Sequence, residues 1–222
     1  MNFDYTYISL GNAKIFEPVT LLTNSFIGAF CVYSFVKIKK YNTKLSTEWA
    51  YFFLLLGISS CFGSTAHAVH YQLGNLFLNT VIFLMNSLSL LSIYFCFKAA
   101  NTSLLLHKPQ QNKYTTYIVM AWVLILLIFT LINNDFLLIK IHAGLVLMYS
   151  LITHSITYFK KQTGSGWIAG GILVSFISII IHSLKLSISD WFNYKDIAHV
   201  VILISSIIMV KGILLKLKSL KA

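Results

Sequence analysis

The sequence has no arginine, only 6 acidic residues among 222 and only 2 prolines. Charged residues make up 10% of the chain, whereas a soluble domain carries about 25%. This shortage of charge excludes a soluble globular domain, because the surface of such a domain needs polar groups to face water. The 3 cysteines, Cys31, Cys61 and Cys96, form no C-x-x-C pair, so neither a zinc knuckle nor a disulfide framework is indicated.

Lysine supplies all 17 basic residues, and the formal net charge is +11. Nucleic-acid-binding proteins also carry such a charge, but here the lysines lie between long apolar runs. Hydrophobic residues make up 57% of the chain, and its mean hydropathy is +0.77. We therefore expect a protein integral to a membrane, whose partner is membrane lipid and not nucleic acid.

Seven apolar stretches are each long enough to span a bilayer, whose hydrocarbon core of about 30 Å needs about 20 residues of helix. We expect a single all-α domain over 1–222, built as a bundle of seven transmembrane helices. The expected helices lie near 18–38, 48–70, 74–97, 115–133, 136–158, 167–186 and 195–215. At the start of the first, Glu17-Pro18 is typical of a helix N-terminus, with a carboxylate as N-cap and a proline in the first turn.

The positions of the lysines also predict the orientation of the bundle. If the N-terminus lies outside, the inner loops and the C-terminal tail hold 13 of the 17 lysines and the outer segments hold 4. Lysine and arginine favour the cytoplasmic side of a membrane. We therefore expect the N-terminus outside and the C-terminus inside, and the compact chain and its composition indicate a bacterial inner membrane.

Polar residues of the expected helices gather near the outer end of the bundle. On the first helix, Glu17, Thr20 and Asn24 share one face through their i, i+3 and i+7 spacing. Five of the seven histidines also fall near this end. The polar residues that we expect there from the later helices are Ser64, His67, His70, Asn79, His142, His182, Asp196 and His199.

Such a cluster predicts a functional site, because a charged residue inside a membrane costs about 2.5–3.5 kcal/mol on insertion scales. Histidines from different helices, together with carboxylates, are what a zinc site requires. The zinc ion would lower the pKa of a bound water and so make a hydroxide nucleophile. The alternative is structural, since histidine, serine and asparagine near helix ends also join helices by hydrogen bonds.

His67 and His199 are the better placed candidate ligands. Asp196 lies three residues before His199 and shares its face, where it would orient the ring, bind the metal or only cap the helix. His182 is a third candidate ligand, although a single histidine at a helix end more often serves in packing. Ser64 is a candidate catalytic residue three positions before His67, but two side chains on one helix are weak evidence of nucleophilic catalysis.

Two short motifs resemble those of the CREST superfamily of seven-helix membrane proteins, which includes alkaline ceramidases and the adiponectin and progestin receptors. The stretch Glu17-Pro-Val-Thr-Leu-Leu-Thr-Asn24 is similar to the first-helix motif of this superfamily. Phe62-Gly-Ser-Thr-Ala-His67 is similar to its second-helix motif, and an Asp/His pair opens the seventh helix. The chain is most similar to small bacterial members.

The resemblance implies a zinc ion held by three histidines, one on the second helix and two on the seventh, with a serine and an aspartate near the metal-bound water. His67 matches the second-helix ligand and His199 the later ligand of the seventh. The chain departs from the pattern at three positions. Lys195 stands where the superfamily has its other seventh-helix histidine, Gly63 where it has the serine, and Asn79 where it has a third-helix aspartate.

Two functions remain open at this point. The first is a zinc-dependent hydrolase that acts, like a ceramidase, on a lipid amide or ester at the outer face. Its third ligand would be His182, His70 or Asp196, and Glu17 and Asn24 would support the site. The second is a non-enzymatic membrane sensor or lipid-binding protein with a degenerate metal site, in which binding shifts the packing of the helices.

Overall fold

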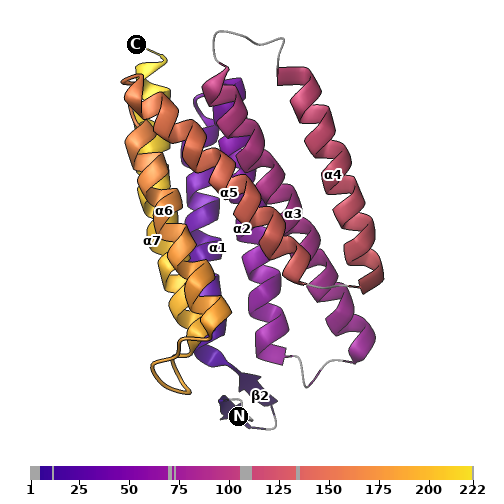
Figure 1. The fold of residues 1–222 in the computed structure, drawn as a ribbon. Helices are drawn as coiled ribbons and strands as arrows, with labels where there is room; N and C mark the ends of the chain where they lie inside the picture. The colour runs from indigo at the N-terminus through magenta and orange to yellow at the C-terminus, as the bar shows by residue number, and fades with distance from the viewer. Residues whose placement is uncertain are drawn as a thin grey trace.

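The computed structural model describes residues 6–11, 13–69, 72, 74–105, 112–133 and 136–221. Over these residues the chain forms a short β-hairpin followed by seven α-helices (Figure 1). The strands are β1 (Tyr7–Leu10) and β2 (Ala13–Phe16). The helices are α1 (Pro18–Lys39), α2 (Lys44–Val69), α3 (Asn75–Leu104), α4 (Asn112–Asn133), α5 (Phe136–Phe159), α6 (Ser165–Leu184) and α7 (Tyr194–Ser219).

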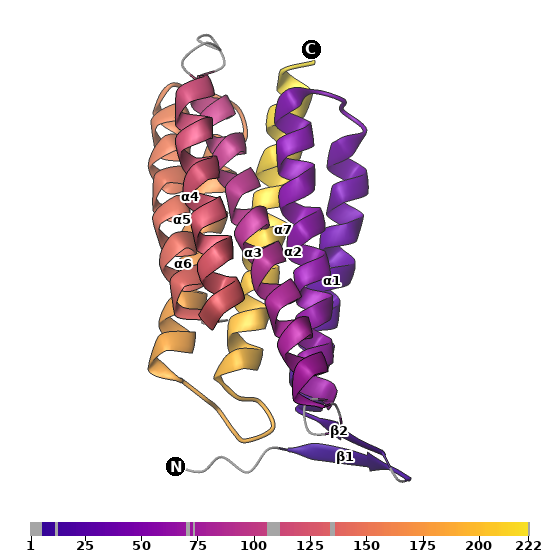
Figure 2. The same ribbon diagram turned by 90° about the vertical axis from the view of Figure 1, so that its right-hand side faces the viewer.

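Successive helices run in opposite directions and so define two ends of the bundle. The β-hairpin lies at the end where α1, α3, α5 and α7 begin, which we call the hairpin end (Figure 2). The opposite end, where α7 finishes, is the C-terminal end. Strand β2 also contacts α2, so the hairpin is joined to both of the first two helices.

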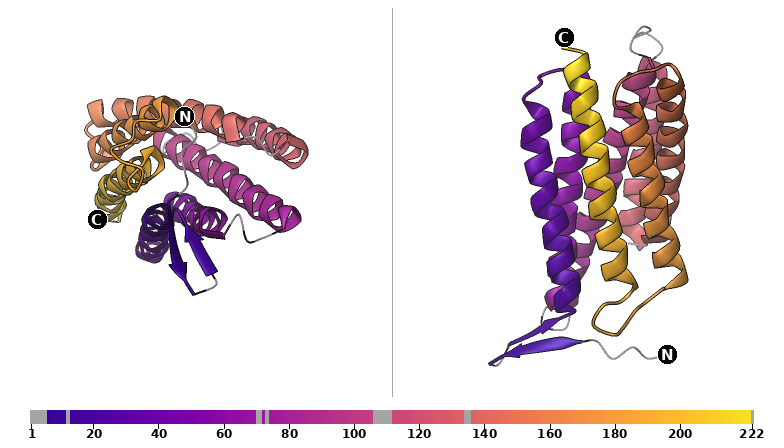
Figure 3. Two further views of the ribbon diagram at one scale, coloured as in Figure 1. Left: turned by 90° about the horizontal axis from the view of Figure 1, so that it is seen from below. Right: turned by 90° about the vertical axis from the view of Figure 1, so that its left-hand side faces the viewer.

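Six of the helices pack as a closed ring. The neighbours in this ring are α1 with α2, α2 with α3, α3 with α5, α5 with α6, α6 with α7, and α7 with α1. Helix α4 packs against α3 and lies at the edge of the bundle (Figure 3). The first and last helices are therefore neighbours, which brings residues from both ends of the sequence together.

All seven helices are long and apolar enough to cross a membrane. The 22 residues of α1 extend about 33 Å, which matches the apolar core of a bilayer. Large apolar side chains are exposed on the outside of the bundle, among them Ile118, Leu145 and Phe159. Such a surface is suited to lipid and not to water, as in an integral membrane protein.

The all-α class and the seven expected helices are confirmed. Helix α2 begins at Lys44 and not near 48, because Thr43 and Ser46 cap each other. The backbone N–H of Ser46 donates to Thr43 Oγ1 at 3.0 Å, and that of Thr43 donates to Ser46 Oγ at 2.8 Å. Helix α3 continues past residue 97, and its added turns bury Ala99 and Ala100.

The β-hairpin is an element that the sequence did not lead us to expect. Its two strands pair antiparallel from Tyr7 opposite Phe16 to a turn that contains Gly11, whose φ of +61° suits glycine. Strands of four residues are too short for a clear alternation of polar and apolar positions. Because an isolated two-stranded hairpin is only marginally stable, contacts with the bundle stabilise this one.

Helices α6 and α7 approach each other closely at glycines. A Cβ added to Gly171 would lie 2.9 Å from the backbone oxygen of Ser205 and 2.9 Å from the backbone nitrogen of Met209. A Cβ added to Gly212 would lie 2.7 Å from the backbone oxygen of Gly164. Small residues at such positions allow the backbones of membrane helices to touch, which increases their van der Waals contact.

Two neighbouring glycines of α6 test this packing. Gly171→Ala is expected to lower the free energy of unfolding by about 1–3 kcal/mol, because backbone atoms of α7 must move. Gly170→Ala is the matched control: nothing lies within 4 Å of a Cβ at Gly170, so a small gain from helix propensity is expected. Thermal unfolding in detergent measures both, and equal losses in the two variants would contradict the close approach.

Candidate ionic site at the hairpin end

The site begins at Glu17, the residue between β2 and α1. Its backbone is left-handed, with φ 43° and ψ 56°, and its N–H donates to the carbonyl of Thr6 at 2.8 Å. The sequence predicted that the carboxylate of Glu17 caps α1, and this was wrong, since its side chain makes no cap hydrogen bond. A left-handed conformation costs a non-glycine residue about 1–2 kcal/mol. It turns the carboxylate away from the helix end and leaves it 5% exposed.

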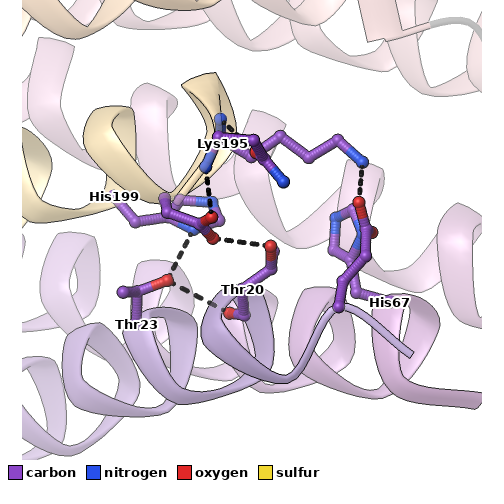
Figure 4. Close-up of polar contacts among 8 residues, drawn as sticks. Thr20, Thr23, His67, Lys195 and His199 are labelled. Carbon is purple, nitrogen blue, oxygen red and sulfur yellow. Dashed lines mark hydrogen bonds and ion pairs between the residues drawn. The ribbon is translucent and has the colours of Figure 1, made fainter. Parts of the chain in front are cut away.

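Glu17 joins three helices through its two carboxylate oxygens. Its Oε2 pairs with Nδ1 of His67 on α2, and its Oε1 accepts a hydrogen bond of 2.5 Å from Nζ of Lys195 on α7 (Figure 4). Burial alone would raise the pKa of Glu17, but His67 and then Lys195 lower it from the usual 4.5 to about 2. Glu17 is therefore ionised at neutral pH.

A second contact between α1 and α7 lies beside this ion pair. Thr20 donates a hydrogen bond of 2.6 Å to Oδ1 of Asp196, which is fully buried. The other oxygen of Asp196 accepts from the N–H of Asn193 at 2.8 Å, while Oδ1 of Asn193 accepts from the N–H of Lys195 at 2.9 Å. Asp196 thus belongs to the capping box of α7 and also ties that helix to α1.

The predicted histidine ligands have different partners in the structure. Nδ1 of His199 lies 3.1 Å from Oγ1 of Thr23, which also contacts the carbonyl of Thr20 at 3.2 Å (Figure 4). Nδ1 of His182 lies 3.5 Å from Nζ of Lys140 on α5, and the His182 ring meets that of Tyr194 edge-on at 5.1 Å.

The remaining predicted residues lie apart from the ion pair. Ser64 donates a hydrogen bond of 3.1 Å to the carbonyl of Leu21. Asn24 is buried, and its Nδ2 lies 3.4 Å from where a Cβ of Gly63 would stand, so the amide occupies the space beside this glycine. Asn79 is exposed near the start of α3. His70 falls outside the described residues.

An open groove lies between α1 and α2, and Leu21 and Ser64 line the part of it that is nearest in sequence to the ionic site. Its volume is about 780 Å³, and small or apolar side chains line most of it. Besides Tyr33, three residues with hydroxyls line it, and each donates to a carbonyl: Ser25 and Ser64 both bond to Leu21, and Thr65 bonds to Cys61. Hydroxyls that donate to backbone carbonyls have no base beside them and are not activated nucleophiles.

The donor groups do not form the three-histidine zinc site that the resemblance implies. Within the described residues, no group of three or more His, Cys, Asp or Glu side chains is placed to hold a metal ion. The position of the third histidine carries Lys195, whose ammonium group is an ion-pair partner and not a ligand. Zinc binding therefore stays an untested prediction.

Sequence reasoning identified Glu17, His67 and Asp196 but missed the role of Lys195. It treated this lysine as one of the few basic residues outside the membrane and as a failed metal ligand. A signal was present: Lys195 lies four residues before His199, so both share one face of α7 and both face the bundle. The role of Thr23 was missed as well, although the same kind of signal was present. Thr23 follows Thr20 by about one helical turn, so both lie on one face of α1.

The chain was also compared with known proteins. A family model described as "Family of unknown function (DUF6962)" matches residues 19–218, which is most of the chain. No curated protein and no solved structure matches the chain.

The ion pair predicts how stability depends on pH. Since binding to His67 and Lys195 lowers the pKa of Glu17, its contribution is fully present above pH 4.5 and is lost as the pH falls toward 2. Glu17→Gln removes this contribution of about 3 kcal/mol at pH 7. Its deficit relative to wild type should shrink below pH 4.5.

Thermal unfolding in detergent between pH 7 and pH 3 measures this deficit. Asp190→Asn is the matched control, because Asp190 is an exposed acid at the same end and is expected to contribute little. A deficit that is the same at every pH would show that Glu17 stabilises the bundle by packing and not by charge.

Proposed function

The chain belongs to the family of unknown function DUF6962, and we propose that it is a non-enzymatic lipid-binding protein of the membrane. One acyl chain lies in the groove between α1 and α2. The headgroup of the same lipid lies against His67 and Lys195 at the hairpin end. Binding there biases how α1, α2 and α7 pack, which is how such a protein senses its lipid.

The observation that carries this proposal is that residues lining the groove lie within about one helical turn of the ionic site on both α1 and α2. Ser64 and Leu21 line the groove, and each is about one helical turn from a member of the ion pair, His67 and Glu17 respectively. A volume of about 780 Å³ lies within the usual range of roughly 300–1,000 Å³ for ligand sites. An acyl chain in the groove thus brings its polar head beside His67.

The exposure of the charged groups indicates which headgroup fits. Glu17 is 5% exposed, whereas His67 and Lys195 are 29% and 19% exposed. The Lys195 ammonium, which is a donor only, therefore reaches the surface, and the carboxylate acceptor of Glu17 is buried beneath it. This arrangement favours a headgroup rich in acceptor oxygens, such as a phosphate or an ester carbonyl.

A zinc-dependent lipid hydrolase is the second candidate, and one observation favours it. Nδ1 of His67 contacts Glu17, and Nδ1 of His199 contacts Thr23. Contacts of this kind orient the rings of metal-bound histidines. The ammonium of Lys195 between them favours the metal-free alternative, because a protonated amine repels a divalent cation.

We also propose that the hairpin end faces outward and that the protein lies in a bacterial inner membrane. The sequence assigns 13 of 17 lysines to the C-terminal end, which supports a cytoplasmic position for that end. The lipid site is then in the outer half of the bilayer.

Metal content separates the two candidate functions. Mass spectrometry of detergent-purified protein, reloaded with zinc, is expected to find well below one zinc ion per chain. His67→Ala and His199→Ala should leave this low content unchanged. Near-stoichiometric zinc in the wild type that is lost in both variants would establish a zinc site, contradict the metal-free proposal and justify a search for lipid hydrolysis.

Lipid retention tests the groove directly. Ala29 is exposed and lines the groove, so Ala29→Trp fills it without changing a buried residue. Losing contact with two or more methylene groups, at about 0.8 kcal/mol each, should weaken phospholipid binding about tenfold or more. Leu145→Trp, on the lipid-facing side of α5, is the control.

Native mass spectrometry in detergent, with added phosphatidylglycerol, measures the bound fraction for each variant. Retention is expected to fall in Ala29→Trp and to stay at the wild-type level in Leu145→Trp. If both variants bind as the wild type does, the groove does not hold the acyl chain.

A further inference from the structure

A second group of buried polar side chains lies at the C-terminal end, far from the ionic site. It centres on Trp49 of α2 and His154 of α5, whose ring centroids are 5.9 Å apart. Both residues are fully buried. Trp49 lies five residues after the start of α2, and His154 lies five residues before the end of α5. Both rings therefore sit at a similar depth, about 7.5 Å from the helix ends.

The polar atoms of this pair have no protein partner. Among the described residues, neither ring nitrogen of His154 makes a hydrogen bond, and neither does Nε1 of Trp49. Oε2 of Glu48 and Oγ of Ser103, both buried at the same end, also lack one. A buried donor or acceptor without a partner costs about 1–3 kcal/mol, so three such atoms in one contact pair point to a bound ligand.

The surrounding charge limits what this ligand can be. Lys216 of α7 is close enough to interact electrostatically with His154, but its Nζ donates to Gln162 Oε1 at 2.9 Å and to Ser165 Oγ at 3.2 Å. A metal cation is disfavoured by this ammonium and by the N–H of Trp49, which is a donor only. A neutral molecule that both donates and accepts suits a neutral imidazole beside an indole.

We propose that Trp49 and His154 bind an ordered water molecule between α2 and α5. The water accepts a hydrogen bond from Nε1 of Trp49 and bonds to a ring nitrogen of His154. Internal waters make about two to four hydrogen bonds to buried polar groups, and the tryptophan and the histidine supply two of them. The site exchanges with solvent at the C-terminal end, because both rings lie near that surface. It is independent of the proposed lipid site.

Radiolytic hydroxyl-radical labelling in oxygen-18 water tests this site, because a buried side chain is modified only where a bound water supplies the radical. Trp49 is expected to take up oxygen-18 label in the full chain in detergent. Phe53, which is as fully buried but apolar, is expected to stay unmodified and serves as the internal control.

Two variants of His154 connect the label to the proposed contact. His154→Gln keeps one donor and one acceptor, and labelling of Trp49 should persist. His154→Phe removes both, and labelling of Trp49 should be lost because one indole N–H alone does not hold a water. Ile152→Phe, on the exposed side of the same helix, controls for the added ring and should leave the label unchanged.

Two results would overturn the proposal. If Trp49 is as unreactive as Phe53 in the wild type, no water is bound there. If His154→Phe labels Trp49 as strongly as the wild type does, any water present is not held by His154. Neither result bears on lipid binding at the hairpin end, which the metal and lipid measurements decide separately.

Discussion

A buried carboxylate is stable only when hydrogen-bond donors surround it. The arrangement of the hairpin end depends on the donors that surround Glu17. Its two oxygens take one donor from α2 and one from α7, while the hairpin holds its backbone in the left-handed conformation that aims it there. The cost of burying one charge is offset only when all these partners are in place. The relative positions of α1, α2 and α7 follow from this requirement.

The same ion pair occupies the positions at which the motifs resemble a metal site. Lys195 stands where the resemblance implies a histidine. Its ammonium carries one positive charge, whereas a zinc ion in a site of that kind would carry two. Glu17 then pairs with the Lys195 ammonium as well as with His67, and His199 finds a hydroxyl partner in Thr23. The bundle keeps the polar residues that resemble a metal site, and hydrogen bonds within the protein connect them. These contacts are the basis of our proposal that the site holds a lipid headgroup.

Much of the fold was predictable because it depends on properties local to each segment. Apolar stretches of about 20 residues define the helices. The end of the bundle where polar residues gather was predictable as well. Which side chains pair with each other at that end was not predictable. These pairs depend on the order of the helices around the ring and on the left-handed backbone of Glu17. Ser64 and Asn24 illustrate this limit, because both lie on the expected helix faces but neither contacts the ion pair. Ser64 donates to the carbonyl of Leu21, and the amide of Asn24 lies beside Gly63.

The closure of the ring between α1 and α7 has a consequence for the biogenesis of the protein. Lys195 and Asp196 belong to α7, which is synthesised long after Glu17 and Thr20 at the start of α1. During synthesis Glu17 can pair with His67 once α2 has been made, but its other carboxylate oxygen lacks the Lys195 ammonium until α7 is inserted. A chain that stops before α7 therefore keeps a buried carboxylate with only one of its two side-chain partners, and the hairpin end is complete only when α7 closes the ring.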